Sequence, residues 1–152
     1  MLSYLEVPPY GRLRRGNGIL NIGCGVDIIE IEKVKKAVDS GGERFCKKIF
    51  TYSEIKYCEN RKNSRYRHYA VRFAAKEAVA KVLGTGFSNG VRWTDIEVVC
   101  DERGNPSIIL HGSARDLAES MGIKQISISL SHCDCHAVAV AVSMDMSRDA
   151  SL

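Results

Sequence analysis

The chain has 152 residues, a formal net charge of +4 and 45% hydrophobic residues. This length accommodates one domain with a substantial core, but not two. No stretch approaches the roughly 18 apolar residues that a membrane span needs, and residues 1–18 carry prolines, glycines and arginines where a signal peptide would need an apolar centre. The positive charge is concentrated from Lys33 to Lys81, which favours an acidic partner or a phosphate-rich substrate.

The cysteine content is high enough for three disulfides, yet the chain is larger than the miniproteins that disulfides hold together. With no secretory leader expected, reduced thiols in a cytoplasmic protein are the better interpretation. The six cysteines are Cys24, Cys46, Cys58, Cys100, Cys133 and Cys135.

The first half of the sequence predicts one strand followed by helices. Residues 22–29 are apolar with two glycines, as in a buried strand, so Asp27 would lie late in that strand. Residues 30–38 change to helical spacing, and Gly41-Gly42 breaks this helix before a second helical stretch over 43–50. Residues 51–54, Thr-Tyr-Ser-Glu, fit a capping box that would start a third helix.

A long central helix is predicted over residues 66–83. Its apolar side chains fall within one arc, and Gly84 would cap its C-terminus. The arc is formed by Val71, Ala74, Ala75, Ala78, Val79 and Val82, and the residues expected outside it are Arg72, Lys76, Glu77 and Lys81. The small residues indicate close packing of this helix against a sheet.

The second half predicts two hairpins separated by a helix. Residues 96–98 and 107–110 alternate around a turn at 101–106. Ser113 could cap a helix that ends at Gly122, after which residues 126–131 alternate strictly and residues 137–142 return as the second hairpin. Because the late strands join by tight turns, the pattern favours an α+β fold with an antiparallel sheet over a doubly wound parallel sheet.

The predicted organisation is a single domain over residues 21–146. Residues 1–20 read as a flexible N-terminal extension, and residues 147–152 read as a polar C-terminal tail.

Glu77 and Lys81 are four residues apart and therefore share one face of the central helix. A carboxylate there can hold a hard cation, and an ammonium can neutralise phosphate oxygens. The same spacing is also among the commonest surface ion pairs, and Asp27 at a strand end can equally be a turn acceptor. Taken singly, none of these positions establishes a site.

Three motifs nevertheless follow one another along the chain. Gly-x-Asp occupies residues 25–27, Phe-Ala-Ala-Lys-Glu-x-x-x-Lys occupies residues 73–81 and leads to Gly84-Thr85-Gly86, and Ser131-His132 precedes an apolar strand. This order resembles the small holo-acyl-carrier-protein synthases of the AcpS type, which are 4'-phosphopantetheinyl transferases. The resemblance covers residues 22–144.

The resemblance implies a Mg²⁺-dependent transfer of 4'-phosphopantetheine from coenzyme A to a serine of apo acyl carrier protein, in fatty acid biosynthesis. Asp27 and Glu77 would bind Mg²⁺, and Lys81 would supply a positive charge as the pyrophosphate breaks. Asp27, Glu77 and Lys81 are thus the expected catalytic residues. Glu77 is also a candidate proton acceptor, although a carboxylate that binds the metal is a weakened base.

The resemblance also implies binding surfaces. The expected coenzyme contacts are Lys62, Arg72, Lys81, Gly84, Thr85, Gly86 and His132. Lys33 and Arg44 are expected to bind the acidic carrier protein. Relatives of this type form homotrimers, so Asp27 and His132 of one chain would work with Glu77 and Lys81 of its neighbour.

Two other functions compete with this interpretation. A basic, non-enzymatic module could bind RNA or another polyanion through residues 33–72, with strong salt dependence. The cluster of residues 132–136, His-Cys-Asp-Cys-His, could bind zinc, but it lacks Cys-x-x-Cys and a second ligand pair at suitable spacing.

Overall fold

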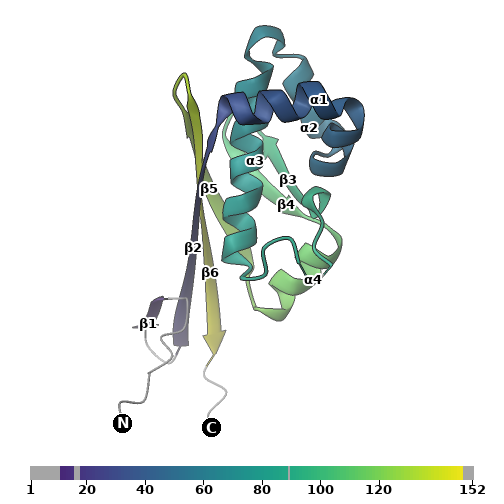
Figure 1. Cartoon of the computed structure of the whole chain (residues 1–152). Coiled ribbons are helices and arrows are strands. Elements are labelled where there is room, and N and C mark those ends of the chain that lie inside the picture. The colour runs from purple at the N-terminus through teal and green to yellow at the C-terminus, as the bar shows by residue number, and fades with distance from the viewer. Residues whose placement is uncertain (1–10, 16–17, 89, 149–152) are drawn as a thin grey trace, which may run out of the picture.

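A computed structural model describes residues 11–15, 18–88 and 90–148, with side chains described between residues 21 and 144. Four antiparallel strands form the main sheet in the order β1-β2-β6-β5, and the long helix α3 lies across one face of it (Figure 1). The elements are β1 (Gly11–Arg15), β2 (Gly18–Glu30), β6 (His136–Arg148), β5 (Gln125–His132) and α3 (Arg65–Val82). The α+β class and the central helix are confirmed.

Two helices and a short turn of 3-10 helix connect β2 to α3. They are α1 (Ile31–Ile49), α2 (Tyr52–Glu59) and η1 (Lys62–Ser64). α1 is kinked where Gly42 adopts φ 54°, a conformation that glycine tolerates best. The predicted capping box is present, since Thr51 Oγ1 accepts from Glu54 N and Glu54 Oε2 accepts from Thr51 N at 2.8 Å.

A two-stranded ribbon lies on the other side of α3 from the main sheet (Figure 1). The ribbon consists of β3 (Ile96–Cys100) and β4 (Pro106–Leu110); the 3-10 turn η2 (Trp93–Asp95) precedes it, and the helix α4 (Gly112–Ser120) follows it. α3 is thus enclosed between two β layers. Its alanines, among them Ala74 and Ala78, are fully buried, as are Ala139 and Ala141 of β6, because small side chains let helix and sheet approach closely.

Three expectations need correction. His111, and not Ser113, is the N-cap of α4, and no side chain caps that end. Arg72 and Lys76 were expected outside the buried arc, but both are buried. They are accommodated because each finds a partner on the far side of α3 from the sheet: Arg72 lies over the ring of Tyr57 and Lys76 pairs with Glu54.

The boundaries at the two ends also differ from the expected domain limits. Residues 11–15 pair with residues 18–22 of β2, so the sheet includes part of the segment that was expected to be a flexible extension. β6 likewise continues to Arg148, inside the expected tail. Residues 1–10, 16–17 and 149–152 lie outside the described part of the chain.

Candidate active site

The site begins with the contact between β2 and α3 at Gly25. A Cβ atom at this position would lie 2.0 Å from the carbonyl oxygen of Ala78 and 3.2 Å from Cβ of Lys81. Only glycine leaves room for the helix backbone to lie this close to the strand. The sequence analysis did not assign Gly25 this role, although Gly23 and Gly25 on one strand face, opposite an alanine-rich helix, carried the signal.

Asp27 follows Gly25 on the same face of β2 and meets α3 near the end of the helix. The Lys81 ammonium lies 2.9 Å from Asp27 Oδ1 and donates to the carbonyl oxygen of Val26 at 2.6 Å. The two side chains are 49% and 20% exposed, respectively. This pair is therefore open to solvent and to a substrate.

Glu77 lies one helical turn before Lys81 and is half-buried. Burial raises the pKa of Glu77, and the negative charge of Asp27 raises it further, while Lys81 acts in the opposite direction. Because Lys81 pairs with Asp27 and lies one helical turn from Glu77, the three side chains lie near one another. Asp27, Glu77 and Lys81 thus meet within one chain, and the expectation that Asp27 works with Glu77 and Lys81 of a neighbour is corrected.

The donor chemistry of this cluster suits a hard cation. Two carboxylates lie near a single ammonium, so the cluster carries one uncompensated negative charge when Asp27 and Glu77 are both ionised. Mg²⁺ is commonly bound by one or two carboxylates together with substrate phosphates and water. The described residues contain no group of three His, Cys, Asp or Glu side chains placed to hold a metal. Asp27 and Glu77 could therefore supply only part of a coordination shell.

The turn after α3 follows the cluster directly. Gly84 and Gly86 adopt φ values of 74° and 56°, which favour glycine, and Gly84 N donates to Lys81 O at 3.1 Å. A Cβ atom at Gly86 would have open space within 4 Å. Thr85 is half-buried between these glycines. The structure thus brings the turn next to Lys81, with room for a ligand beside Gly86.

The other expected coenzyme contacts lie elsewhere. Lys62 is exposed in η1, and His132 is exposed at the end of β5, two strands away from Asp27 across the sheet. Arg72 is only 2% exposed, and its guanidinium lies 3.9 Å from the centre of the Tyr57 ring. The structure therefore places Arg72 in the protein interior, away from solvent.

α1 carries the residues expected to bind a carrier protein. Lys33 and Arg44 are both exposed, and Lys33 makes an ion pair of 2.9 Å with Glu30 one helical turn away. An exposed pair of this kind contributes little stability, so Lys33 can exchange Glu30 for an acidic partner at low cost.

The sequence analysis missed a second lysine pair on α3. The Lys76 ammonium lies 2.8 Å from Glu54 Oε2 and also donates to the carbonyl oxygens of Trp93 and Ile96. Glu54 Oε1 accepts from Val98 N at 2.9 Å, and both side chains of the pair are fully buried. Burial lowers the pKa of Lys76, and Glu54 opposes this shift. The pair ties α2 and β3 to α3.

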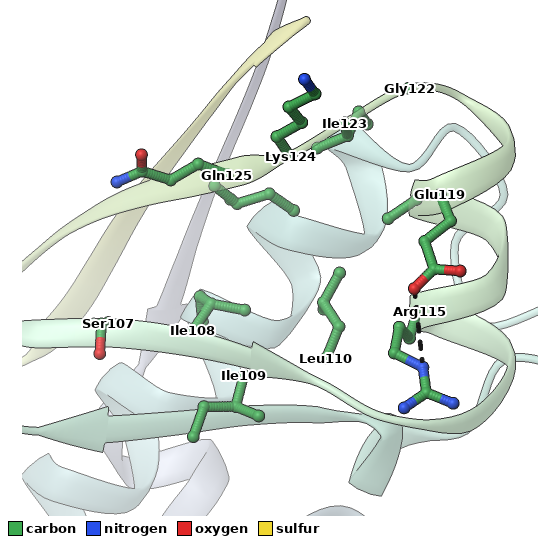
Figure 2. Close-up of a pocket in the computed structure, with 12 residues that line it drawn as sticks. Ser107, Ile108, Ile109, Leu110, Arg115, Glu119, Gly122, Ile123, Lys124 and Gln125 are labelled. Atoms are coloured by element: carbon green, nitrogen blue, oxygen red, sulfur yellow. Dashed lines mark ion pairs between the residues drawn. The ribbon is translucent and has the colours of Figure 1, made fainter.

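A separate cavity of about 730 Å³ lies between β4, α4 and the start of β5 (Figure 2). Ile108, Leu110 and Ile126 line it, and the ion pair of Arg115 with Glu119, 3.9 Å apart, lies at its side. None of the expected site residues lines this cavity. The candidate active site is therefore the cluster where β2 meets α3.

The family comparison covers most of the chain. A model of the 4'-phosphopantetheinyl transferase superfamily matches residues 23–141. A holo-[acyl-carrier-protein] synthase of Ruminiclostridium cellulolyticum is 48% identical over 107 residues, which are 70% of this chain and 80% of that protein.

Solved structures share the fold. The holo-[acyl-carrier-protein] synthase of Neisseria meningitidis gives a TM-score of 0.72 at 29% identity and covers 80% of this chain and 96% of its own. The holo-(acyl-carrier-protein) synthase of Bacillus anthracis, solved in complex with CoA (3',5'-ADP), gives 0.68 at 35% identity and covers 81% of this chain and 96% of its own.

Proposed function

The chain belongs to the 4'-phosphopantetheinyl transferase superfamily, and we propose that it is a holo-[acyl-carrier-protein] synthase. It transfers 4'-phosphopantetheine from coenzyme A to a serine of apo acyl carrier protein and releases adenosine 3',5'-bisphosphate. The observation that carries this proposal is the cluster of Asp27, Glu77 and Lys81 beside the Gly84–Gly86 turn. The comparisons give no support to the alternative of a polyanion-binding module.

Mg²⁺ is the cofactor that this cluster fits. Asp27 and Glu77 would hold it, and the bound ion would neutralise charge on the pyrophosphate of coenzyme A. Lys81 adds a cation beside the same phosphates, and its pair with Asp27 fixes the position of the ammonium. Because a carboxylate that holds Mg²⁺ is a weakened base, we assign Glu77 to metal binding, and its raised pKa is a property of the metal-free site.

Coenzyme A would be bound by residues that stay accessible. The Gly84–Gly86 turn lets the chain approach a phosphate closely, and Lys62 and His132 supply polar side chains from η1 and β5. Arg72 is left out of this set because its guanidinium is buried over Tyr57. The acidic carrier protein would bind α1 through Lys33 and Arg44, both of which are exposed.

A homotrimer is supported by the face of the main sheet that α3 does not cover. Val26 and Ile28 of β2 are 54% and 65% exposed there, and Met144 of β6 is 54% exposed. Apolar side chains gathered on one open sheet face are typical of a surface that another protein covers. His132, two strands from Asp27, would then contribute to the site of a neighbouring chain.

Mixing two inactive variants tests this assembly. Chains carrying Asp27→Ala and chains carrying His132→Ala are expected to be inactive separately and to regain part of the activity when they are unfolded and refolded together. Reactivation would require a site built from two chains. Size-exclusion chromatography with light scattering measures the assembly directly, and a monomer would contradict the proposal.

We also expect the protein to be cytoplasmic, where its six cysteines would stay reduced, and the structure pairs none of them. The described part of the chain contains no helix that is both long and apolar enough to cross a membrane.

The reaction is tested by the intact mass of an apo acyl carrier protein incubated with this protein, coenzyme A and Mg²⁺. A gain of one phosphopantetheine is expected, and EDTA is expected to prevent it. Asp27→Ala should slow the reaction by roughly a thousandfold while circular dichroism stays unchanged. An unmodified carrier protein with wild-type enzyme, or an undiminished gain in EDTA, would contradict the proposed transfer or its metal dependence, respectively.

A further inference from the structure

The turn that joins β5 to β6 carries two thiols that the proposed reaction does not use. Residues 133–135 are Cys-Asp-Cys, and all three residues are exposed. The turn lies between His132, the last residue of β5, and His136, the first residue of β6. Both thiols are therefore accessible to small molecules and lie at a fixed point of the fold.

Backbone hydrogen bonds and one ion pair hold this turn in place. Cys133 N donates to the carbonyl oxygen of His136 at 2.9 Å, and Ile31 N donates to the carbonyl oxygen of Cys135 at 2.8 Å. Asp134 also pairs with Arg67 of α3 at 3.1 Å. The turn is thus tied to the first residue of α1 and to the start of α3.

The geometry around Cys133 favours its thiolate. Backbone hydrogen bonding from Cys135 and His136 lowers the pKa of the Cys133 thiol, while desolvation and the nearby charge of Asp134 oppose the effect. The buried thiols of the same chain behave oppositely. Burial raises the pKa of Cys58 to about 12 and raises that of Cys46 as well. Cys133 therefore combines exposure with stabilisation of its reactive form.

The spacing of the two thiols also permits a bond between them. Two residues of chain span at most about 7 Å even when fully extended, and a turn brings them closer. Disulfides form across Cα separations of about 4.4–6.8 Å. The sequence spacing of Cys133 and Cys135 across a turn is therefore compatible with a disulfide.

We propose that Cys133 and Cys135 form a redox-active dithiol that reacts with low-molecular-weight disulfides. The Cys133 thiolate attacks one sulfur of the small disulfide, so that a mixed disulfide forms and one small thiol leaves. The Cys135 thiolate then attacks the Cys133 sulfur, which releases the second small thiol and closes the bond between Cys133 and Cys135. The protein loses two hydrogens and the small disulfide is reduced.

Oxidised glutathione tests the proposal on the whole reduced protein. Intact mass is expected to show loss of two hydrogens and no retained glutathione, and peptide mapping without reduction should assign the new bond to residues 133 and 135. In the Cys135→Ser variant the first step should remain trapped, with one glutathione on Cys133. In the Cys133→Ser variant the internal disulfide should be absent.

The matched control is Cys133 in the urea-unfolded chain, where the same thiol lacks the hydrogen bonds of the folded turn. Cys133 is expected to react with a thiol-labelling reagent several-fold faster in the folded protein than in the unfolded chain. Equal rates in the two states, or wild-type protein that keeps glutathione on Cys133 as the Cys135→Ser variant does, would overturn the proposal. These measurements do not depend on transferase activity.

Closure of the dithiol has one consequence that rests on the proposed function. Because Ile31 N donates to the Cys135 carbonyl oxygen, a change in the backbone of the turn on disulfide closure would disturb the start of α1, the helix that carries Lys33. Oxidised wild-type protein should therefore modify the carrier several-fold more slowly, and a reductant should restore the rate. The Cys135→Ser variant, kept reduced, should show no such response; an oxidised protein with undiminished rate would overturn this consequence while leaving the chemistry of the dithiol standing.

Discussion

Two lysine pairs on different faces of α3 show how burial separates a structural pair from a functional one. The Lys76 and Glu54 pair spans 2.8 Å and is fully buried, whereas the Lys81 and Asp27 pair spans 2.9 Å with side chains 49% and 20% exposed. The ammonium of Lys76 is satisfied by Glu54 and two carbonyl groups. The Lys81 pair instead leaves Glu77 nearby with a raised pKa. The first pair is enclosed by protein, whereas the second is open to solvent, where we propose that it meets the substrate.

Substituting each lysine in turn separates the two pairs most clearly. Lys76→Met should lower the free energy of unfolding by roughly 3–5 kcal/mol, because Glu54 would be left charged and buried. Lys81→Met, an equivalent change at a half-exposed pair, should alter it by less than about 1 kcal/mol and yet slow transfer by roughly a hundredfold. Urea denaturation and carrier modification measure both effects. Comparable loss of stability in the two variants would contradict this division.

Gly25→Ala tests whether close packing of β2 against α3 positions the open pair. The added Cβ atom would lie 2.0 Å from the Ala78 carbonyl oxygen, so helix and strand must separate. A loss of roughly 1–3 kcal/mol in unfolding free energy is expected from such overpacking. Transfer should also slow, because Glu77 would move away from Asp27.

The matched control is Ser107→Ala at an exposed position of β4, outside the cluster, which should change neither property. A Gly25→Ala protein with wild-type activity would show that the close approach is not needed for the reaction.

Of these substitutions, Glu77→Gln should change stability the least, and it should raise stability where the others lower it. Because the pKa of Glu77 is raised in the folded protein, the unfolded chain releases this proton first, and folding stability falls as pH rises above the ordinary glutamate pKa of 4.5. The glutamine side chain does not titrate, so the variant should melt about 2 °C higher than the wild-type protein at pH 7 in EDTA. Below pH 4 the two proteins should melt at the same temperature. Thermal melts across this range measure the difference, and a lower melting temperature at pH 7 would refute the electrostatic explanation.

The agreement between sequence and structure depends on whether a signal is local. The strand over residues 22–29, the break at Gly42, the capping box at Thr51 and the central helix are all confirmed, because each depends on spacing or on a single backbone preference. The prediction that Ser113 caps α4 was wrong, because the apolar pattern fits several starting residues for this helix equally well.

The burial of Arg72 and Lys76 was not predictable from helical spacing. A helix with a single buried face would expose both residues, but β3 and α2 cover the second side of α3. Charged residues can be buried there only because Tyr57 and Glu54 arrive from other elements. No local pattern reports such partners, since they are separated from α3 by many residues of chain.

By itself, the sequence determined the α+β class, the order of helices and strands, and three motifs that together indicate a phosphopantetheinyl transferase. The class and the elements follow from the periodicity of apolar residues, which acts along the chain, and the function follows from the resemblance of the three motifs to a known family. Only the tertiary structure decided that Asp27, Glu77 and Lys81 meet within one chain, that Gly25 makes this possible, and that Lys76 serves the core. Distances between distant segments depend on how closely their backbones can pack, and steric fit in three dimensions sets that approach.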